Sequence, residues 1–149
     1  MLEWMHDESV VSHLGTDFSK KTLENCLGFI AASLQDENNL HLAIADKNDT
    51  YMGTVSLKHI DPQEKNAEFA ITVRACAMGK GFSAYGMGEI LRKGITELGL
   101  QDIYWCVSPK NERAVRFYDK HGYLRVTAVP RKILANYPED MKLIWYVYR

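Results

Sequence analysis

Long apolar runs and an excess of one charge are both missing from this sequence. Its longest apolar runs fall far short of the roughly 20 residues that span a bilayer. Its 18 basic and 19 acidic residues leave a formal net charge of −1, so the chain lacks the basic field that attracts nucleic acid. We therefore expect neither a membrane nor a nucleic acid among its partners.

Cysteine and histidine are too few and too scattered to indicate a disulfide framework or a metal centre. The three cysteines (Cys26, Cys76 and Cys106) form no C-x-x-C pair, and the five histidines show no H-E-x-x-H or H-x-H spacing. Such cysteines are typical of reduced intracellular thiols. The first ten residues also contain three acids where a secretory signal would be basic and then apolar. We expect a cytoplasmic protein with no metal site.

What the sequence does contain is a change of hydrophobic period along one domain-sized chain. The 149 residues suit a single domain over residues 1–149. Asp7 is a candidate N-cap for a first helix. The next apolar positions, four, three and four residues apart, indicate one face of a second helix that ends by residues 38–39; they are Leu23, Leu27, Ile30 and Leu34.

Strand-like segments occupy the middle and the end of the sequence. Alternating or β-branched runs predict strands at 40–45, 51–60, 67–74, 102–107, 123–129 and 143–149. The strand at 67–74 places Phe69, Ile71 and Val73 on one face and Glu68, Ala70 and Thr72 on the other. Helices are expected at about 84–98, ending at Gly99, and between 108 and 122. This order predicts a mixed α/β, α+β-like fold rather than a doubly wound one.

The segment ACAMGKGFSAYGMGE, residues 75–89, contains four glycines before an apolar-striped helix whose stripe is Ala84, Met87, Leu91, Ile95 and Leu98. No G-x-x-x-x-G-K-[ST] string occurs, and a dinucleotide fingerprint should follow the first strand of its fold, whereas several strands precede this one. Two interpretations stay open from this segment alone. The glycines serve only a tight turn, or the unpaired N–H groups at the helix start form an anion site.

A second segment, SPKNERAVRFYDKHGY at residues 108–123, resembles the GNAT superfamily of acyl-CoA-dependent N-acyltransferases. It matches the pattern N-x-x-A-x-x-x-Y-x-x-x-G-F/Y through Asn111, Ala114, Tyr118, Gly122 and Tyr123. The resemblance extends over about residues 40–125. It implies a central, mostly antiparallel sheet with a splayed parallel strand pair and helices on both faces, here without the strand that usually precedes the first helix.

The glycine segment resembles the same family's R/Q-x-x-G-x-G/A loop. Met78 stands where the family has Arg or Gln, and Ser83 stands where it has Gly or Ala. The resemblance implies that acetyl-CoA, as co-substrate, binds between the strands at 67–73 and 102–107. The residues that would hold it are Ile71, Thr72 and Val73 through their backbone, the loop Met78, Gly79, Lys80, Gly81, Phe82 and Ser83, and Asn111. Ser83 could also cap the helix.

The implied reaction is attack of a primary amine on a thioester, which requires a base and a donor to the leaving thiolate. Glu68 resembles the family's glutamate base, and Tyr118 occupies its general-acid position. Glu68 as a surface carboxylate and Tyr118 as a core tyrosine are the alternatives. Weaker base candidates are Asp61, Glu64 and Glu112. Cys106 has no paired histidine in sequence and is expected to be a buried thiol.

The acceptor is a small-molecule or peptide amine that the sequence does not identify. Trp4, His6 and Asp7 resemble the opening of the subgroup that acetylates ribosomal-protein N-termini and sugar-nucleotide amines, although Trp4 also suits core packing. His6 or Asp7 could reach an acceptor. A homodimer is compatible with the sequence. The alternative function is a catalytically weak acyl-CoA-binding or sensor module, which the departure at Met78 keeps open.

Overall fold

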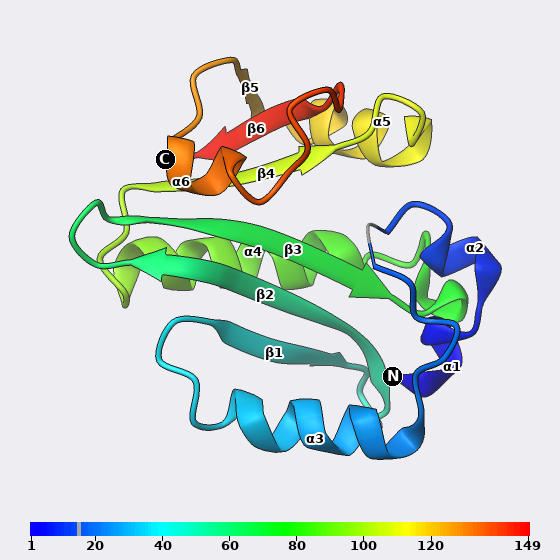
Figure 1. Cartoon of the computed structure of the whole chain (residues 1–149). Helices are drawn as coiled ribbons and strands as arrows, with labels where there is room; N and C mark the ends of the chain where they lie inside the picture. The colour runs from blue at the N-terminus through cyan, green and yellow to red at the C-terminus, as the bar shows by residue number, and fades with distance from the viewer. Residues whose placement is uncertain (15) are drawn as a thin grey trace.

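A computed structural model of the chain describes residues 1–14 and 16–149, and it contains one six-stranded sheet with helices around it (Figure 1). The strand order is β1-β2-β3-β4-β6-β5. The strands are β1 (Leu40–Ala45), β2 (Tyr51–Asp61), β3 (Asn66–Val73), β4 (Asp102–Val107), β5 (Leu124–Val126) and β6 (Ile144–Tyr148). The helices are α1 (Leu2–Met5), α2 (Glu8–Val11), α3 (Leu23–Ser33), α4 (Phe82–Thr96), α5 (Glu112–Lys120) and α6 (Arg131–Leu134), with a 3-10 turn, η1 (Ala75–Ala77).

The sheet consists of two antiparallel parts joined by one short parallel ladder. β1 pairs with β2 and β2 with β3 in antiparallel fashion, and β6 pairs in the same way with β4 and β5. Between the two parts, Asn66–Glu68 pairs in parallel with Asp102–Tyr104. Beyond Glu68 and Tyr104 the two strands diverge, so the remaining residues of β3 pair with no described residue on the β4 side. The splayed pair expected from the family resemblance is confirmed.

One face of the sheet packs against α4 and α5 around the main core. Met87, Ile90 and Leu91 of α4 are completely buried there, and the helix lies across β1 to β4. α4 begins two residues earlier than expected and ends at Thr96, so Leu98 of the predicted stripe lies outside it and is exposed. None of the helices in the described residues is long and apolar enough to cross a bilayer.

The other face carries two smaller apolar clusters. The first gathers Trp4, Met5, Val10 and Cys26 from the N-terminal helices. The second gathers Tyr104, Ile133, Trp145 and Val147 where α6 covers β4 and β6. The helices therefore lie on both faces, as expected. The final strands are shorter than predicted, with β5 limited to three residues.

Helix α3 departs from the usual relation between an apolar stripe and burial. Thr22 caps it with a reciprocal bond to Asn25, which accounts for its start. Its predicted apolar face is exposed, with Leu23 at 62%, Leu27 at 59%, Ile30 at 45% and, just past the helix, Leu34 at 83% exposure. Only Cys26 of α3 is buried. The spacing thus predicted the helix correctly, but the stripe covers no core of this chain.

Candidate active site

The glycine loop between β3 and α4 has the geometry of an anion site. Gly79 and Gly81 have φ values of +75° and +88°, which glycine adopts without strain. Gly81 is the N-cap of α4 and has no side chain that could bond to the first turn. The first-turn N–H groups, which have no partner within a helix, therefore remain available to a ligand. Ser83 does not cap the helix, because it lies inside the first turn.

The side chain at Met78 does not block this loop. It is half-buried and packs against both the main core and the N-terminal cluster. Beside it lies Arg113 of α5, whose Nη1 is 3.6 Å from the Met78 sulfur. Its Nη2 lies 3.7 Å from the point where a Cβ on Gly79 would stand. Arg113 therefore supplies a cation next to the loop where the family's Arg or Gln is missing. Sequence reasoning missed it, because 35 residues separate it from Met78.

The two strands that would flank the co-substrate present free backbone groups to each other. Ile71 and Thr72 of β3 pair with Val55 and Thr54 of β2 on one side only, because β4 has already turned away. Across the gap, Asn111 is the N-cap of α5, and its Oδ1 accepts a hydrogen bond of 3.3 Å from the Ala114 N–H. Its NH₂ group makes no hydrogen bond within the part of the chain that the structure describes. The structure thus places the loop that follows β3 next to α5, which follows β4, beyond the end of the parallel ladder.

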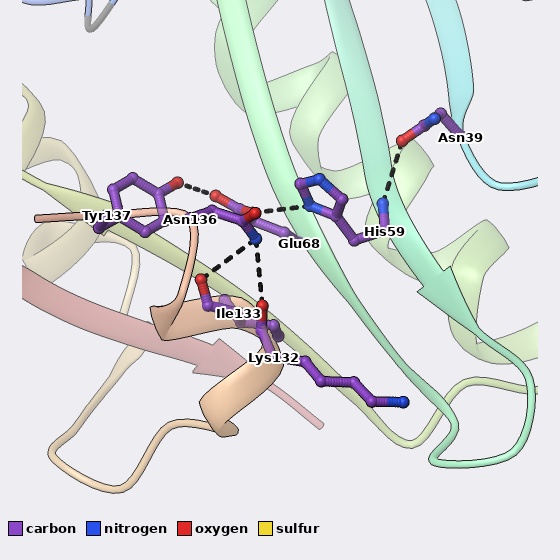
Figure 2. Close-up of polar contacts among 7 residues, drawn as sticks. All are labelled: Asn39, His59, Glu68, Lys132, Ile133, Asn136 and Tyr137. Carbon is purple, nitrogen blue, oxygen red and sulfur yellow. Dashed lines mark hydrogen bonds and ion pairs between the residues drawn. The ribbon is translucent and has the colours of Figure 1, made fainter.

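Glu68 lies where the parallel ladder ends, and its carboxylate is buried with two partners (Figure 2). The residue is only 2% exposed. The Nδ1 atom of His59 lies 3.2 Å from Oε2, and the hydroxyl of Tyr137 donates to Oε1. A buried carboxylate needs such donors, because desolvation of its charge is costly. The expectation of a strand-edge surface carboxylate is therefore excluded.

Both partners of Glu68 are themselves held in place. His59 sits at an irregularity of β2 with φ of +52°, and its N–H donates to Oδ1 of Asn39 at 3.0 Å. Tyr137 packs edge-on against Trp145 with ring centroids 5.3 Å apart. The side chain of His59 is half-exposed, so it connects the buried carboxylate with solvent. Sequence reasoning did not find this trio, because Tyr137 follows Glu68 by 69 residues.

Tyr118 lies on the opposite face of the sheet from Glu68, in the core under α5. Its ring contacts Trp105 and Tyr146, and burial raises its pKa far above the ordinary value of a tyrosine. In the described residues its hydroxyl makes no hydrogen bond. The hydroxyl oxygen is not fully buried, however. Among the described residues, the one fully buried side-chain nitrogen or oxygen without a partner is Trp105 Nε1. Tyr118 thus keeps its proton at neutral pH and is able to donate a hydrogen bond.

The weaker candidates are less suited to catalysis. Asp61 accepts from the backbone N–H groups of residues 63 and 64 and from Lys132 Nζ at 3.2 Å, which lowers its pKa. Burial, followed by the nearby charge of Glu68, raises the pKa of the Cys106 thiol to about 12, so it is a poor nucleophile. Glu64 and Glu112 are exposed. Among residues 1–14 and 16–149, no cluster of three His, Cys, Asp or Glu side chains could hold a metal ion.

A pocket of about 310 Å³ lies on the face of β3 that carries Glu68. Trp4 lines it and also fills the N-terminal cluster, where its Nε1 donates to the Tyr51 hydroxyl at 3.1 Å. The predicted acceptor residues His6 and Asp7 do not line it. His6 bonds to the Lys21 carbonyl at 2.8 Å, and Asp7 caps α2. Both residues make local contacts, and His6 also lines an adjoining hollow of about 440 Å³ that shares Met5, Thr16 and Phe18 with the pocket.

The chain matches the family model described as the Acetyltransferase (GNAT) domain over residues 1–124. It therefore belongs to the GNAT acetyltransferase family. Spermidine N(1)-acetyltransferase of Vibrio cholerae is 29% identical over 103 residues, which cover 69% of this chain and 60% of that enzyme. The enzyme of the same name from Escherichia coli K12 is 32% identical over 71 residues, or 48% of this chain and 38% of its own length. The chain thus spans less than two thirds of these relatives.

Solved structures agree on the fold. A Vibrio cholerae spermidine N-acetyltransferase in complex with CoA and spermine has a TM-score of 0.80 at 18% identity, with 99% of this chain and 86% of that chain covered. A dodecameric structure of the spermidine N-acetyltransferase from Vibrio cholerae has a TM-score of 0.68 at 21% identity, with 85% and 74% covered. At these identities the likeness supports the GNAT fold alone. It does not support the ribosomal-protein and sugar-nucleotide subgroup suggested by the N-terminal residues.

Proposed function

We propose that this protein transfers the acetyl group of acetyl-CoA to a primary amine by direct attack. The observation that carries the proposal is the arrangement at the end of the parallel ladder. A buried carboxylate, Glu68, lies on one face of the sheet at the point where β3 and β4 part. On the other face lies the phenol of Tyr118, which has no hydrogen-bond partner among residues 1–14 and 16–149. A thioester in the gap would have a base on one side and a proton donor on the other.

In this proposal the co-substrate is held mainly by backbone groups. The first-turn N–H groups of α4, with Gly79 and Gly81, would bind the pyrophosphate, and Arg113 would add a positive charge. The free edge of β3 at Ile71, Thr72 and Val73 would pair with the pantetheine arm like an added strand. Asn111 would donate to the arm from the other side. Met78, Lys80, Phe82 and Ser83 complete the loop.

The chemistry follows from the environment of the two ionisable groups. An alkyl ammonium must lose its proton before it attacks, and Glu68 would accept that proton and pass it through His59 to solvent. Tyr118 would donate to the developing thiolate of the leaving group. A phenol that starts near pKa 10 is already a weaker acid than a thiol near 8.5. Because burial raises the pKa of Tyr118 further, its main contribution would be a hydrogen bond.

The acceptor and the assembly belong to the same proposal. Because both relatives are named spermidine N(1)-acetyltransferase, a polyamine is the first acceptor that they suggest.

The exposed apolar stripe of α3 supports self-association, for which a homodimer is the simplest form. The three free cysteines support a cytoplasmic location. Sedimentation of wild type and of Leu27→Asp would test the association, which the charge should weaken.

The decisive test is release of thiol from acetyl-CoA in the presence of a panel of primary amines. Amine-dependent release above the rate of thioester hydrolysis is expected. The alternative is a module that binds acyl-CoA without transferring its acyl group. Such a sensor would be stabilised by CoA, by about 2.7 kcal/mol at 100 times the dissociation constant. It would release no thiol with any amine, and Tyr118→Phe would change none of its properties.

A further inference from the structure

The carboxylate of Asp119, the residue after Tyr118, ties α5 to the last two strands of the sheet. Its Oδ1 accepts hydrogen bonds from the Tyr146 hydroxyl of β6 at 2.9 Å and from Arg125 Nε of β5 at 3.1 Å. Its Oδ2 accepts a bond from Arg125 Nη2 at 2.6 Å. Among the described residues, no other side chain of α5 forms a hydrogen bond with a strand. Asp119, Arg125 and Tyr146 thus form a clamp between the helix and the sheet.

The clamp is closed, because its two donors also meet each other. Arg125 and Tyr146 are opposite residues of the β5–β6 ladder, and the guanidinium carbon lies 5.9 Å from the centroid of the Tyr146 ring. Hydrogen bonding by Arg125 lowers the pKa of Asp119, which is therefore a carboxylate at neutral pH. Burial, followed by the bond to Asp119, raises the pKa of Tyr146, so its hydroxyl remains a donor. All three hydrogen bonds are therefore charge-assisted.

The ring of Tyr146 connects the clamp with the ring of Tyr118. Tyr146 is completely buried, its ring stacks on Trp105 at a centroid distance of 5.7 Å, and its centroid lies 5.1 Å from that of Tyr118. Within α5, which the structure describes throughout, only Tyr118 is buried. Since the Tyr118 hydroxyl has no hydrogen bond of its own in the described residues, its position depends on ring packing and on where α5 lies. The clamp acts on both.

The clamp is better suited to positioning than to stabilisation. The side chains of Asp119 and Arg125 are 42% and 52% exposed, and an ion pair so exposed contributes little to stability. A group that assists a reaction must instead be held within about 0.5 Å of its working position. A displacement of about 1 Å can lower a rate by about 10²-fold. Loss of the clamp should therefore appear in kcat before it appears in stability.

We propose that Asp119, Arg125 and Tyr146 are positioning residues that hold the Tyr118 hydroxyl where it meets the thioester. The inference rests on the proposed transfer reaction, in which Tyr118 donates to the leaving thiolate. The clamp residues contact neither the amine nor CoA in this proposal, and they act only through Tyr118. Their removal should therefore cost less than removal of the Tyr118 hydroxyl itself.

Tyr146→Phe in two backgrounds is the kinetic test, because it keeps the ring and removes the bond to Asp119. In the wild type it should lower kcat for amine-dependent thiol release three- to tenfold and leave the KM for acetyl-CoA within twofold. In the Tyr118→Phe background it should change kcat by less than twofold, since the hydroxyl to be positioned is gone. Equal losses in both backgrounds, or no loss in the wild type, would overturn the inference.

The matched control is Tyr148→Phe, on the same face of β6 two residues further along. The Tyr148 hydroxyl forms no hydrogen bond with a described residue of α5. Its removal should leave kcat unchanged in both backgrounds. A loss as large as that of Tyr146→Phe would assign the effect to the strand in general and contradict the clamp.

A fluorine label on Tyr118 provides a readout that needs no turnover. The full chain would carry 3-fluorotyrosine at position 118, and its ¹⁹F signal would be recorded in Arg125→Met and in Arg131→Met. Arg125→Met breaks both bonds to Asp119, whereas Arg131 is exposed in α6 and is the charge-matched control. The signal should shift or broaden in Arg125→Met alone, and an unchanged signal would overturn the inference. A changed signal in a protein that releases no thiol with any amine would support the clamp and contradict the transfer reaction instead.

Discussion

The two ionisable groups of the candidate site lie on opposite faces of the sheet and differ in their hydrogen bonding. Glu68, on the face covered by α6, is buried and engaged by His59 and Tyr137. Tyr118, on the face covered by α5, is also buried, but its hydroxyl has no partner in the described residues. The protein itself fixes the position of the carboxylate. The hydroxyl is left for a ligand, so its role depends on what enters the gap.

This difference predicts that the two groups respond differently to removal. The largest expected effect is that of Glu68→Gln, which keeps the shape and one acceptor oxygen but cannot take up a proton. The kcat for amine acetylation should fall by about 10²–10⁴-fold, the usual contribution of general base catalysis. Steady-state thiol release measures it, and the KM for acetyl-CoA serves as the control and should change little. A fall of less than threefold would make Glu68 a structural residue.

Tyr118→Phe is the matched change on the other face. Because it removes a donor that touches only a ligand, kcat should fall by about 10–100-fold, in proportion to the loss of one hydrogen bond to a charged group. The free energy of unfolding should change by less than about 0.5 kcal/mol, since no bond within the protein is lost. Chemical denaturation provides that second measurement. A large loss of stability with normal kcat would assign Tyr118 to the core alone.

Tyr137→Phe tests the face of the sheet that carries Glu68, and here the expected change is in stability. It takes a donor from a buried carboxylate, which should cost about 1–3 kcal/mol of stability. The same hydroxyl deletion at Tyr118 should cost almost nothing, so the two Tyr→Phe variants form a matched pair under one denaturation assay. If both lose the same stability, the contrast between the two faces is wrong. The volume of the side chain is preserved in each case, so cavities do not contribute.

The glycine loop lies outside this contrast, and its effect should appear in binding. Arg113→Ala should raise the KM for acetyl-CoA about tenfold, because one charge-assisted contact to phosphate is lost, and leave kcat nearly unchanged. Arg116→Ala, an exposed position on the same helix, is the control. Raised salt should reduce the difference in the KM for acetyl-CoA between the two variants, because salt screens the attraction between Arg113 and phosphate. A lowered kcat in Arg113→Ala would connect the loop to chemistry.

The smallest effect is expected at Cys106, which is close enough to Glu68 for its charge to act on the thiol. The pKa of this thiol is raised from 9.0 to about 12 in the folded protein. The neutral thiol therefore stabilises the fold fully below about pH 9, and that contribution is lost as the pH rises toward 12. Cys106→Ala should flatten the fall of stability over that window and keep kcat within twofold. Denaturation at pH 8 and pH 10.5 measures it, and an unchanged slope would contradict the shift.

The sequence was sufficient for most of the elements and for their rough order but not for α6, and α3 and α4 show a second limit. Both helices have apolar side chains at helical spacing, and both helices are present. Met87 and Leu91 are buried under the sheet, whereas Leu27 and Leu34 are exposed. Spacing reports that a helix has one apolar side. It contains no information on whether this chain or another molecule covers that side.

The candidate site could be proposed from sequence only where one segment contains its residues. The loop at 78–83, Asn111 and Tyr118 follow from two local motifs, and Glu68 follows from its strand. Arg113, His59 and Tyr137 became visible only through the fold, because each meets its partner across a turn or a distant loop. Two alternatives were expected for Glu68, a surface carboxylate at a strand edge or a catalytic base. Its burial excludes the surface carboxylate. Burial of this kind depends on α6, whose position no local pattern indicates.

The short ladder between β3 and β4 has a mechanical consequence. In the described residues, three residue pairs form the only strand pairing between β1–β3 and β4–β6. A pantetheine arm that forms hydrogen bonds along the open edge of β3 would add a further connection between these two parts of the sheet. Bound co-substrate should therefore restrict the motion of the two parts relative to each other. Amide hydrogen exchange in residues 69–73 and 105–107 should slow together when the co-substrate binds.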